Sequence, residues 1–264
     1  MVFLKAIAIA DESRVPAGFP FDLPAVESLM ELPFTTPVTF LVGDNGSGKS
    51  TIMEAIACGM KCPTVGRTDV ARDPSLVQAR ALAAQLRFIK TKNPRKRLFF
   101  RAEDAIGFTR RVNEDMADLK EMEAHYNETL SGYARDLATG VVKGQHAAWT
   151  DRYGDDPDAR SHGEWFLNII RERVHGDGLY LLDEPETPLS PVHQIALLSI
   201  MLEAAKENAQ FIVATHSPIL MALPGATILS FDHTPITPVP WDEVEHVNVT
   251  RAFLNDPESF LRHL

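Results

Sequence analysis

Cysteine is scarce: this chain of 264 residues contains two, Cys58 and Cys62. No second pair of Cys or His residues stands at the spacing of a zinc site, which excludes a zinc motif built on them. Both lie on or just past a helix predicted after the glycine-rich segment that ends at Gly48. We expect reduced thiols, which are typical of a cytoplasmic protein.

Long hydrophobic runs are also missing. The apolar start from Met1 to Ala10 is too short to span a membrane. Asp11 and Glu12 follow it, where a signal peptide would need a cleavage site of small residues. We interpret the segment as a first β-strand and expect no membrane insertion. Internal repeats and low-complexity tracts are absent as well.

An excess of positive charge is the third absence. The formal net charge is −10 and the sequence pI is about 5.4, which argues against a broad nucleic-acid-binding surface. A local basic cluster nevertheless exists between Lys90 and Arg101. It is either a solvated loop or hairpin, or a contact for nucleic acid or an acidic partner protein. Its members are Lys90, Lys92, Arg95, Lys96, Arg97 and Arg101.

A glycine-rich segment, Gly43 to Thr51, is the most informative feature that is present. It matches the phosphate-binding pattern G-x-x-x-x-G-K-[ST], with a β-rich apolar run before it and a helix-like run after it. In such loops, backbone N–H groups turn onto phosphate oxygens at a helix N-terminus. We predict a nucleoside triphosphate, with Lys49 on its β- and γ-phosphates and Ser50 on Mg²⁺. The predicted nucleotide-binding residues are Gly43, Asn45, Gly46, Ser47, Gly48, Lys49, Ser50 and Thr51.

A second constellation is an apolar run, Leu179 to Leu182, that ends in two adjacent carboxylates. A buried strand would deliver Asp183 to the Mg²⁺ beside the phosphate loop. Glu184, one residue on, would orient or deprotonate the water that attacks the γ-phosphate. Acidic residues at strand ends also occur as loop caps, and it is the pairing with the phosphate loop that favours the catalytic interpretation.

A third apolar run, Phe211 to Ala214, is followed by Thr215 and His216. Because α/β sheets bind ligands at the carboxyl ends of their strands, we expect His216 to contact the γ-phosphate or the attacking water. A lone histidine is more often structural, but this position favours function.

The remaining elements are predicted from periodicity and punctuation. Several prolines between Pro16 and Pro37 exclude a long helix there. We predict a helix over 75–90, a hairpin-like pair of strands over 97–111 and a helical subdomain over 111–139. The last 90 residues or so indicate crossover units on a parallel sheet.

Ser161 and Glu164 form a capping-box pattern ahead of an amphipathic helix. Taken alone, these residues require nothing beyond a helix start. A helix N-terminus containing Ser161 and Gly163 is also suited to bind an anion.

The order of these motifs resembles that of an ATP-binding-cassette ATPase, and the match covers nearly the whole chain. The signature Ser161-His162-Gly163-Glu164 departs from the Leu-Ser-Gly-Gly-Gln of transporter subunits. It is similar to that of small stand-alone predicted ATPases of the superfamily, as are the switch Ala214 to Pro218 and the segment Phe253 to Leu261. The resemblance implies an α/β fold of the P-loop type, with a mostly parallel central sheet, flanking helices, an antiparallel portion and a small helical subdomain. It implies one domain, 1–264, with a helical or hairpin insertion at about 66–160.

The resemblance also implies a mechanism that needs two copies of the chain. Ser161, Gly163 and Glu164 of a second subunit would close over the γ-phosphate, with Pro188 to Ser190 along the dimer interface. Glu103 takes the position of the glutamine that usually senses Mg²⁺. Phe19 or Phe21 is a candidate for stacking on adenine, although both are equally suited to a core.

The sequence thus predicts a cytoplasmic ATPase that binds ATP and Mg²⁺, dimerises on ATP and acts on a partner protein or nucleic acid. The insertion is too short for the extended coiled coil of chromosome-maintenance relatives. One alternative is the nucleotide-binding subunit of a transporter, which would carry the standard signature and a clear glutamine. The other is a P-loop kinase for a small molecule, which would not need a composite site.

Overall fold

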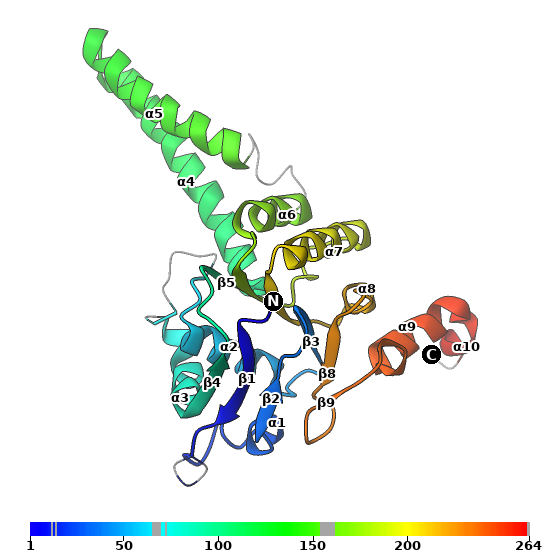
Figure 1. The fold of residues 1–264 in the computed structure, drawn as a ribbon. Helices are drawn as coiled ribbons and strands as arrows, with labels where there is room; N and C mark the ends of the chain where they lie inside the picture. Colours follow the sequence, from blue (N-terminus) through cyan, green and yellow to red (C-terminus); the bar gives the residue numbers. More distant parts are fainter. Residues whose placement is uncertain (12, 14, 65–69, 72, 154–161, 263–264) are drawn as a thin grey trace.

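Two β-sheets form the framework of the molecule (Figure 1). The computed structural model describes residues 1–264 apart from 12, 14, 65–69, 72, 154–161 and 263–264. The larger sheet has the strand order β5-β6-β7-β3-β8-β9 and is parallel except for β9, whereas the smaller sheet, β2-β1-β4, is antiparallel. The strands are β1 Leu4–Ile9, β2 Glu31–Pro33, β3 Val38–Val42, β4 Leu86–Lys90, β5 Lys96–Arg101, β6 Gly178–Asp183, β7 Gln210–Ala214, β8 Thr227–Ser230 and β9 Thr237–Pro238.

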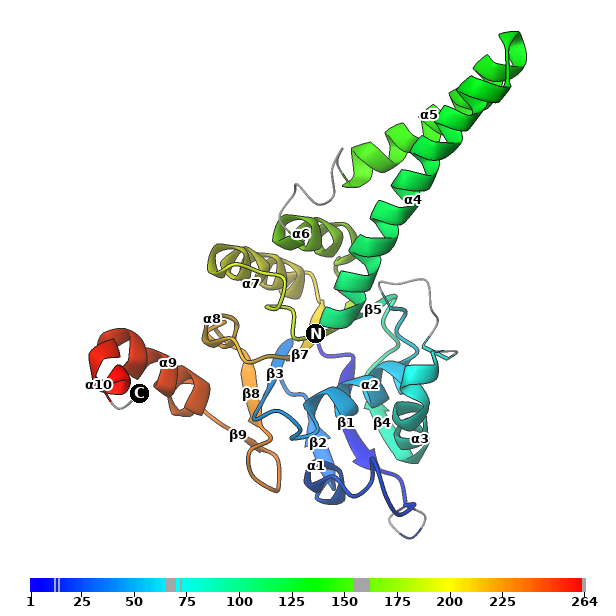
Figure 2. The same cartoon turned by 180° about the vertical axis from the view of Figure 1, so that it is seen from behind.

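Helices cover both faces of the larger sheet (Figures 1 and 2). On one face lie α2 and α3 with the smaller sheet, and on the other lie α6, α7 and α8. This arrangement confirms the predicted fold class. The α-helices are α1 Pro24–Glu27, α2 Lys49–Met60, α3 Val77–Gln85, α4 Ala102–Thr129, α5 Gly132–Tyr153, α6 His162–Arg173, α7 Pro191–Lys206, α8 Pro218–Met221, α9 Glu245–Asn255 and α10 Pro257–Leu261, with 3₁₀ turns at Pro74–Leu76 and Trp241–Glu243.

The central strands divide their side chains between two hydrophobic cores. In β6, Leu179 and Leu181 enter the core shared with α2 and the smaller sheet, while Tyr180 and Leu182 enter the core beneath α6 and α7. Successive side chains of a strand point to opposite faces, so a strand covered on both sides is apolar throughout. Each fully buried leucine contributes about 1.5–3 kcal/mol. The uninterrupted apolar run that predicted this strand is therefore a consequence of its central position.

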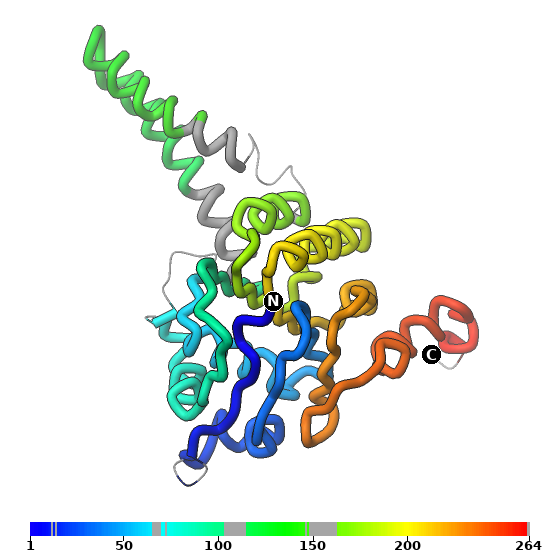
Figure 3. The backbone as a smooth tube through the Cα atoms, in the orientation of Figure 1, coloured from blue at the N-terminus to red at the C-terminus, as the bar shows by residue number. Residues whose placement is uncertain are grey.

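A fully buried glutamine joins the start of the chain to the larger sheet. The Gln210 Oε1 accepts hydrogen bonds from the backbone N–H of Phe3 at 2.8 Å and of Leu4 at 2.9 Å. Its Nε2 donates to the Leu4 carbonyl at 2.9 Å. A buried amide is tolerated because its donor and acceptor are both satisfied. Figure 3 follows the backbone from this central N-terminal region to α9 and α10 at one side of the body.

The helical hairpin of α4 and α5 projects from the body as an arm (Figures 1 and 2). The 28 residues of α4 make a rod of roughly 42 Å at about 1.5 Å per residue. The chain turns at Leu130 and Ser131, and Gly132 opens α5 with a φ of +62°. The predicted helical character of 111–139 is confirmed, with this turn dividing it into two helices.

The helix predicted over 75–90 is wrong over its last 5 residues. After the short α3, residues Leu86–Lys90 form β4, which pairs antiparallel with β1. Leu86, Phe88 and Ile89 suit a strand, and the open edge of β1 supplies hydrogen-bond partners that local periodicity does not reveal. The first strand, predicted within the apolar start from Met1 to Ala10, is confirmed as β1.

The strand pair predicted over 97–111 is also wrong. Only β5 is a strand, and it pairs in parallel with β6 rather than with a following segment. At Ala102 the chain enters α4 directly. The residues after Arg101 begin with Ala, Glu, Asp and Ala, and alanine and acidic residues favour the first turn of a helix over a tight hairpin.

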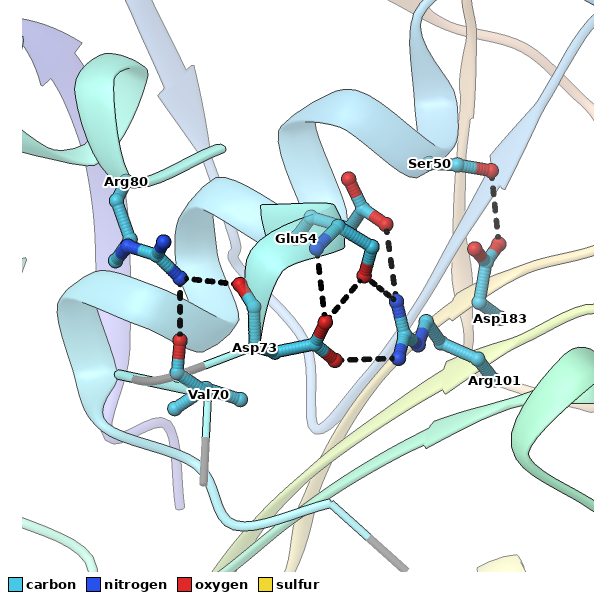
Figure 4. Close-up of polar contacts among 8 residues, drawn as sticks. Ser50, Glu54, Val70, Asp73, Arg80, Arg101 and Asp183 are labelled. Carbon is cyan, nitrogen blue, oxygen red and sulfur yellow. Dashed lines mark hydrogen bonds and ion pairs between the residues drawn. The ribbon is translucent and has the colours of Figure 1, made fainter. Parts of the chain in front are cut away.

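Arg101 is buried at the end of β5, where it joins two other elements (Figure 4). Its Nη2 lies 3.0 Å from Asp73 Oδ2, and its Nη1 lies 3.6 Å from Glu54 Oε1 on α2. Ser75 donates to Asp73 from its backbone N–H and its hydroxyl. Burial acts to raise the pKa of Asp73, but the hydrogen bonds from Ser75 and the nearby guanidinium outweigh it and hold that pKa below its usual range. Arg101 is therefore not part of an exposed basic cluster, contrary to the sequence-based expectation.

We expect Arg101→Met to lower the free energy of unfolding at pH 7 by about 3 kcal/mol, because it leaves the Asp73 carboxylate buried without its cation. The lowered pKa of Asp73 means that the charged carboxylate stabilises the fold above its unfolded pKa, and that this stabilisation is lost as the pH falls through the folded pKa. The loss in the variant should therefore shrink below about pH 4.

Urea denaturation at pH 7 and at pH 3.5 measures both effects. Lys96→Met, at an exposed position of the same strand, is the matched control and should change stability by less than about 0.5 kcal/mol. Equal losses in the two variants would contradict a buried ion pair at Arg101.

Candidate functional site

The glycine-rich segment connects β3 to α2, as the sequence predicts. Gly43, Gly46 and Gly48 have positive φ values of 142°, 81° and 97°. At Gly43 a Cβ atom would lie 2.9 Å from Asp232 Oδ1, so a side chain is excluded by space as well as by conformation. The loop therefore holds a shape that brings its backbone N–H groups to the start of α2.

Asp232 braces this loop, a role that the sequence analysis missed. It follows β8, which pairs in parallel with β3. Its Oδ1 accepts a hydrogen bond from the Asp44 backbone N–H at 2.9 Å, and its Oδ2 accepts one from the Ser230 hydroxyl at 3.1 Å. The available signal was its position, since it lies at the carboxyl end of a strand beside the phosphate loop.

Lys49 is folded over the loop that precedes it. Its Nζ donates to the carbonyl oxygens of Gly43 and Asp44, both at 2.7 Å, and the residue is 5% exposed. Burial lowers the pKa of this ammonium, while the surrounding carboxylates, with Asp183 and Glu184 first among them, oppose the shift. A cation held this way by two carbonyls lies where the phosphates of a bound nucleotide would meet the loop.

Asp183 ends β6 beside the start of α2 (Figure 4). The Ser50 hydroxyl donates to its Oδ1 at 3.2 Å. Burial raises the pKa of Asp183 to about 6, with a further contribution from Glu184, while Ser50 and Lys49 oppose the shift. A hydroxyl and a carboxylate at this separation are the hard oxygen ligands that Mg²⁺ takes together with phosphate oxygens and water. The pair therefore fits a Mg²⁺ bound with a nucleotide.

Glu184 stands directly after this strand in a left-handed conformation, with a φ of +49°. Its backbone N–H donates to the Ala214 carbonyl at 2.9 Å, which ties it to the end of β7. Such a conformation costs about 1 kcal/mol or more in a residue other than glycine and occurs often at functional sites. Glu184 is thereby turned out of the strand to the sheet edge near Lys49.

His216 reaches the same edge from β7. Its backbone N–H donates to Glu186 Oε1 at 2.7 Å, and its Nδ1 lies 3.1 Å from His246 Nε2 on α9. Burial lowers the pKa of His216, and the charges of Lys49 and His246 lower it further. The ring is therefore neutral near pH 7. Glu186 and His246 were not predicted as site residues: no spacing rule marks contacts that span 30 residues.

The signature residues Ser161 to Glu164 are described only in part, and those described differ in burial. α6 begins at His162, as the capping-box pattern predicts, but Ser161 lies outside the described residues. Gly163 is buried, and a Cβ there would lie 2.5 Å from His193 Nδ1 and 3.0 Å from the Pro188 carbonyl. Glu164 is exposed. The signature thus packs against the segment that begins at Pro188.

The other predicted residues stay outside the cluster or outside the description. Glu103 lies in the first turn of α4, two residues past β5, and its side chain is not among those described. Phe21 is buried in the first core, whereas Phe19 is 56% exposed. Cys58 and Cys62 are free thiols. In the described part of the chain, no helix is long and apolar enough to cross a membrane.

Two protein-family models match the chain. The model described as "AAA domain" covers residues 27–134, and the one described as "AAA domain, putative AbiEii toxin, Type IV TA system" covers residues 166–222. The Nucleoside import ATP-binding protein NupA of Lactococcus lactis subsp. cremoris (strain MG1363) is 26% identical over 183 residues, which are 67% of this chain and 32% of that protein. This chain therefore spans less than two thirds of the length of that relative.

Solved structures are similar at lower identity. One is cbiO1 from Clostridium perfringens, part of the ABC transporter complex cbiONQ, with a TM-score of 0.43, 13% identity and 100% of both chains covered. Another is the SMC head domain from Thermotoga maritima, with a TM-score of 0.38, 15% identity, and 90% of this chain and 99% of that chain covered. The phosphate loop, the acidic strand end and the histidine follow one another along this sequence and meet at one sheet edge. Together with the two AAA-domain matches and the similarity to NupA, they support an ATP-binding-cassette ATPase.

Proposed function

We propose that this chain hydrolyses ATP in composite sites, formed when two copies close around bound nucleotide. The observation that carries the proposal is the convergence of Lys49, Ser50, Asp183, Glu184 and His216 from three neighbouring strands at one edge. Hydrolysis of ATP in general is a property of the superfamily, and the assignment of each role below is part of the proposal.

Each residue has a chemical role in this scheme. Lys49 and the loop N–H groups bind the β- and γ-phosphates, and Ser50 with Asp183 would hold the Mg²⁺, whose charge stabilises the phosphate oxygens. Glu184 accepts a proton from the attacking water or orients it. His216 donates a hydrogen bond to the γ-phosphate.

The second half of each site would come from a second copy. Ser161, Gly163 and Glu164 of one subunit would cover the γ-phosphate bound by the other. The packing of Gly163 against the Pro188 carbonyl supports this proposal, because it places the signature beside the segment predicted to line the interface. Glu103 remains the proposed sensor of Mg²⁺, and the cytoplasm remains the proposed location.

One observation favours a second function, the nucleotide-binding subunit of a transporter: the similarity to NupA, whose name describes nucleoside import. The signature of this chain differs from that of transporter subunits, so we rank this function below a stand-alone ATPase. The kinase alternative gains no support from the structure. Transfer of phosphate to an acceptor other than water would revive it.

In Glu184→Gln, we expect ATP and Mg²⁺ to convert the chain into a stable dimer with hydrolysis reduced by roughly 10²–10⁴-fold, because water loses its base while the phosphate contacts remain. Light scattering with and without ATP and Mg²⁺ measures the dimer, and phosphate release measures the rate. Lys49→Ala, which removes a phosphate contact, is the comparison variant and should neither dimerise on ATP nor hydrolyse it.

The wild-type rate per chain should rise with protein concentration. A monomer under all conditions with a rate independent of concentration would contradict the composite site. Full activity in Glu184→Gln, with none in Lys49→Ala, would leave ATP hydrolysis intact and contradict only the base.

We also propose that nucleic acid is the partner of the basic stretch between Lys90 and Arg101. With Arg101 buried, Arg95, Lys96 and Arg97 of this stretch line a hollow of about 450 Å³ between β5, the end of α6 and the turn after α2. In a chain of net charge −10, this local gathering of cations supports contact with phosphates. The charged and ionisable residues that line the hollow are Lys61, Arg95, Lys96, Arg97, Glu172, Arg173 and His175.

Arg95→Gln with Lys96→Gln should weaken binding of a short DNA duplex and lower the slope of log affinity against log salt by about 2, since each lost phosphate contact removes roughly 0.9. Fluorescence anisotropy between low and moderate salt measures the slope. Lys120→Gln with Arg262→Gln, exposed positions elsewhere, remove the same charge and should leave the slope unchanged. Equal effects of both pairs would indicate bulk charge alone, and no binding at low salt would overturn the proposal.

A further inference from the structure

The ring of His216 shares one hydrogen bond with the ring of His246. The His216 Nδ1 and His246 Nε2 atoms are 3.1 Å apart, and the ring centroids are 4.9 Å apart with the planes at 63°. Two nitrogen atoms at this distance need one proton between them, so one ring donates and the other accepts. Which ring donates decides what His216 offers at its other nitrogen.

The two arrangements are chemically opposite. If His246 Nε2–H donates, the neutral His216 carries its proton on Nε2 and can donate to a phosphate oxygen. If His216 Nδ1–H donates, its Nε2 is a bare lone pair, which a phosphate oxygen would repel. A histidine that binds phosphate in its neutral form therefore depends on a donor at Nδ1.

Burial is the main reason why the pKa of His216 is lowered and its ring is neutral, so the tautomer of the ring matters. Lys49 on α2 and His246 on α9 disfavour a positive ring, and Glu184 after β6 with Asp44 of the phosphate loop favour one. The charges that disfavour a positive ring act in the same direction as burial. Glu186 faces the same histidine and accepts from its backbone N–H.

The outer nitrogen of His216 is left free for a ligand. Its Nε2 is buried and has no hydrogen-bond partner in the described part of the chain. Buried polar atoms are rarely left in this state unless a ligand or water completes them. The His216 ring thus has one nitrogen hydrogen-bonded to His246, while the other is available to a ligand.

α9 is anchored where it presents His246. Val247, the next residue, is 2% exposed and belongs to the second core. In the turn before the helix, the Trp241 Nε1–H donates to the Pro218 carbonyl at 3.1 Å, two residues past His216. His246 is itself half-buried. These contacts hold the ring of His246 in place beside the ring of His216.

We propose that His246 is a positioning residue: it donates its Nε2–H to His216 Nδ1 and so holds His216 in the tautomer that donates to the γ-phosphate. This inference rests on the proposed contact of His216 with phosphate. It assigns helix α9 a part in hydrolysis without any contact to the nucleotide.

The test compares His246→Leu, which removes the donor, with His246→Gln, whose side-chain amide keeps a donor near the place of Nε2. We expect kcat to fall by roughly 10–100-fold in His246→Leu, with KM for ATP changed by less than about twofold because ground-state binding is retained. His246→Gln should recover most of kcat. His125→Leu, an exposed histidine on the arm, is the control and should match the wild type.

A second measurement does not depend on hydrolysis. The ¹⁵N chemical shifts of the His216 ring in the nucleotide-free chain of residues 1–264 should show the proton on Nε2 in wild type and His246→Gln, and a mixture of tautomers in His246→Leu. If His216→Ala loses activity while His246→Leu changes neither kcat nor the tautomer, the inference is overturned and the proposed function stands. If His216→Ala hydrolyses ATP normally, the proposed role of His216 itself fails.

Discussion

The parallel pairing of β6 and β3 with β7 is the constraint on which the site depends. Asp183 and Leu41 both stand opposite Ala214 in this register. The pairing continues past the strands, since Glu184 N–H donates to the Ala214 carbonyl and Thr215 N–H donates to the Leu41 carbonyl. A slip of one residue would exchange the two faces of a strand that is buried on both. It would also draw the carboxylates away from the phosphate loop, so the two cores that fix the register also assemble the site.

The charged groups of Asp183 and Lys49 at the same edge are buried, and burial of a charge disfavours folding. The pKa of Asp183 is raised to about 6 chiefly by burial, which means that its ionised form is disfavoured in the protein without a cation. Lys49 compensates only in part, because its own ammonium is also buried. The backbone at Glu184 adds strain of about 1 kcal/mol or more. Bound Mg²⁺ and phosphate would supply the charges that balance this cluster, so the site is built for its ligand at some cost to stability.

Much of this was readable from the sequence, for a physical reason. The phosphate loop is local: its glycines, lysine and serine lie within nine consecutive positions, Gly43 to Thr51. The strand ends at Asp183 and His216 were predicted because a strand buried on both faces is apolar throughout. Contacts between segments that are far apart in the chain leave no such local pattern in the sequence. The edge of β1 that makes β4 a strand is more than 70 residues away in the chain, and the burial of Arg101 depends on Asp73 and Glu54 meeting it. The roles of Ser161 and Glu103 remain predictions.

Two polar contacts join the nucleotide edge to parts of the fold outside it. Glu54 lies on α2, whose first residue is Lys49, and it pairs with Arg101, whose next residue begins the arm. His216 joins the same edge to α9 through His246. The Arg101 side chain is 8% exposed and lies 3.6 Å from Glu54, and the two histidine nitrogens lie 3.1 Å apart, so movement of one partner alone would separate these groups. Packed interiors shift between discrete arrangements rather than deforming smoothly. A shift of α2 would therefore move the base of the arm with it or separate Glu54 from Arg101, and a shift of the segment after β7 would likewise move the start of α9 or separate His216 from His246.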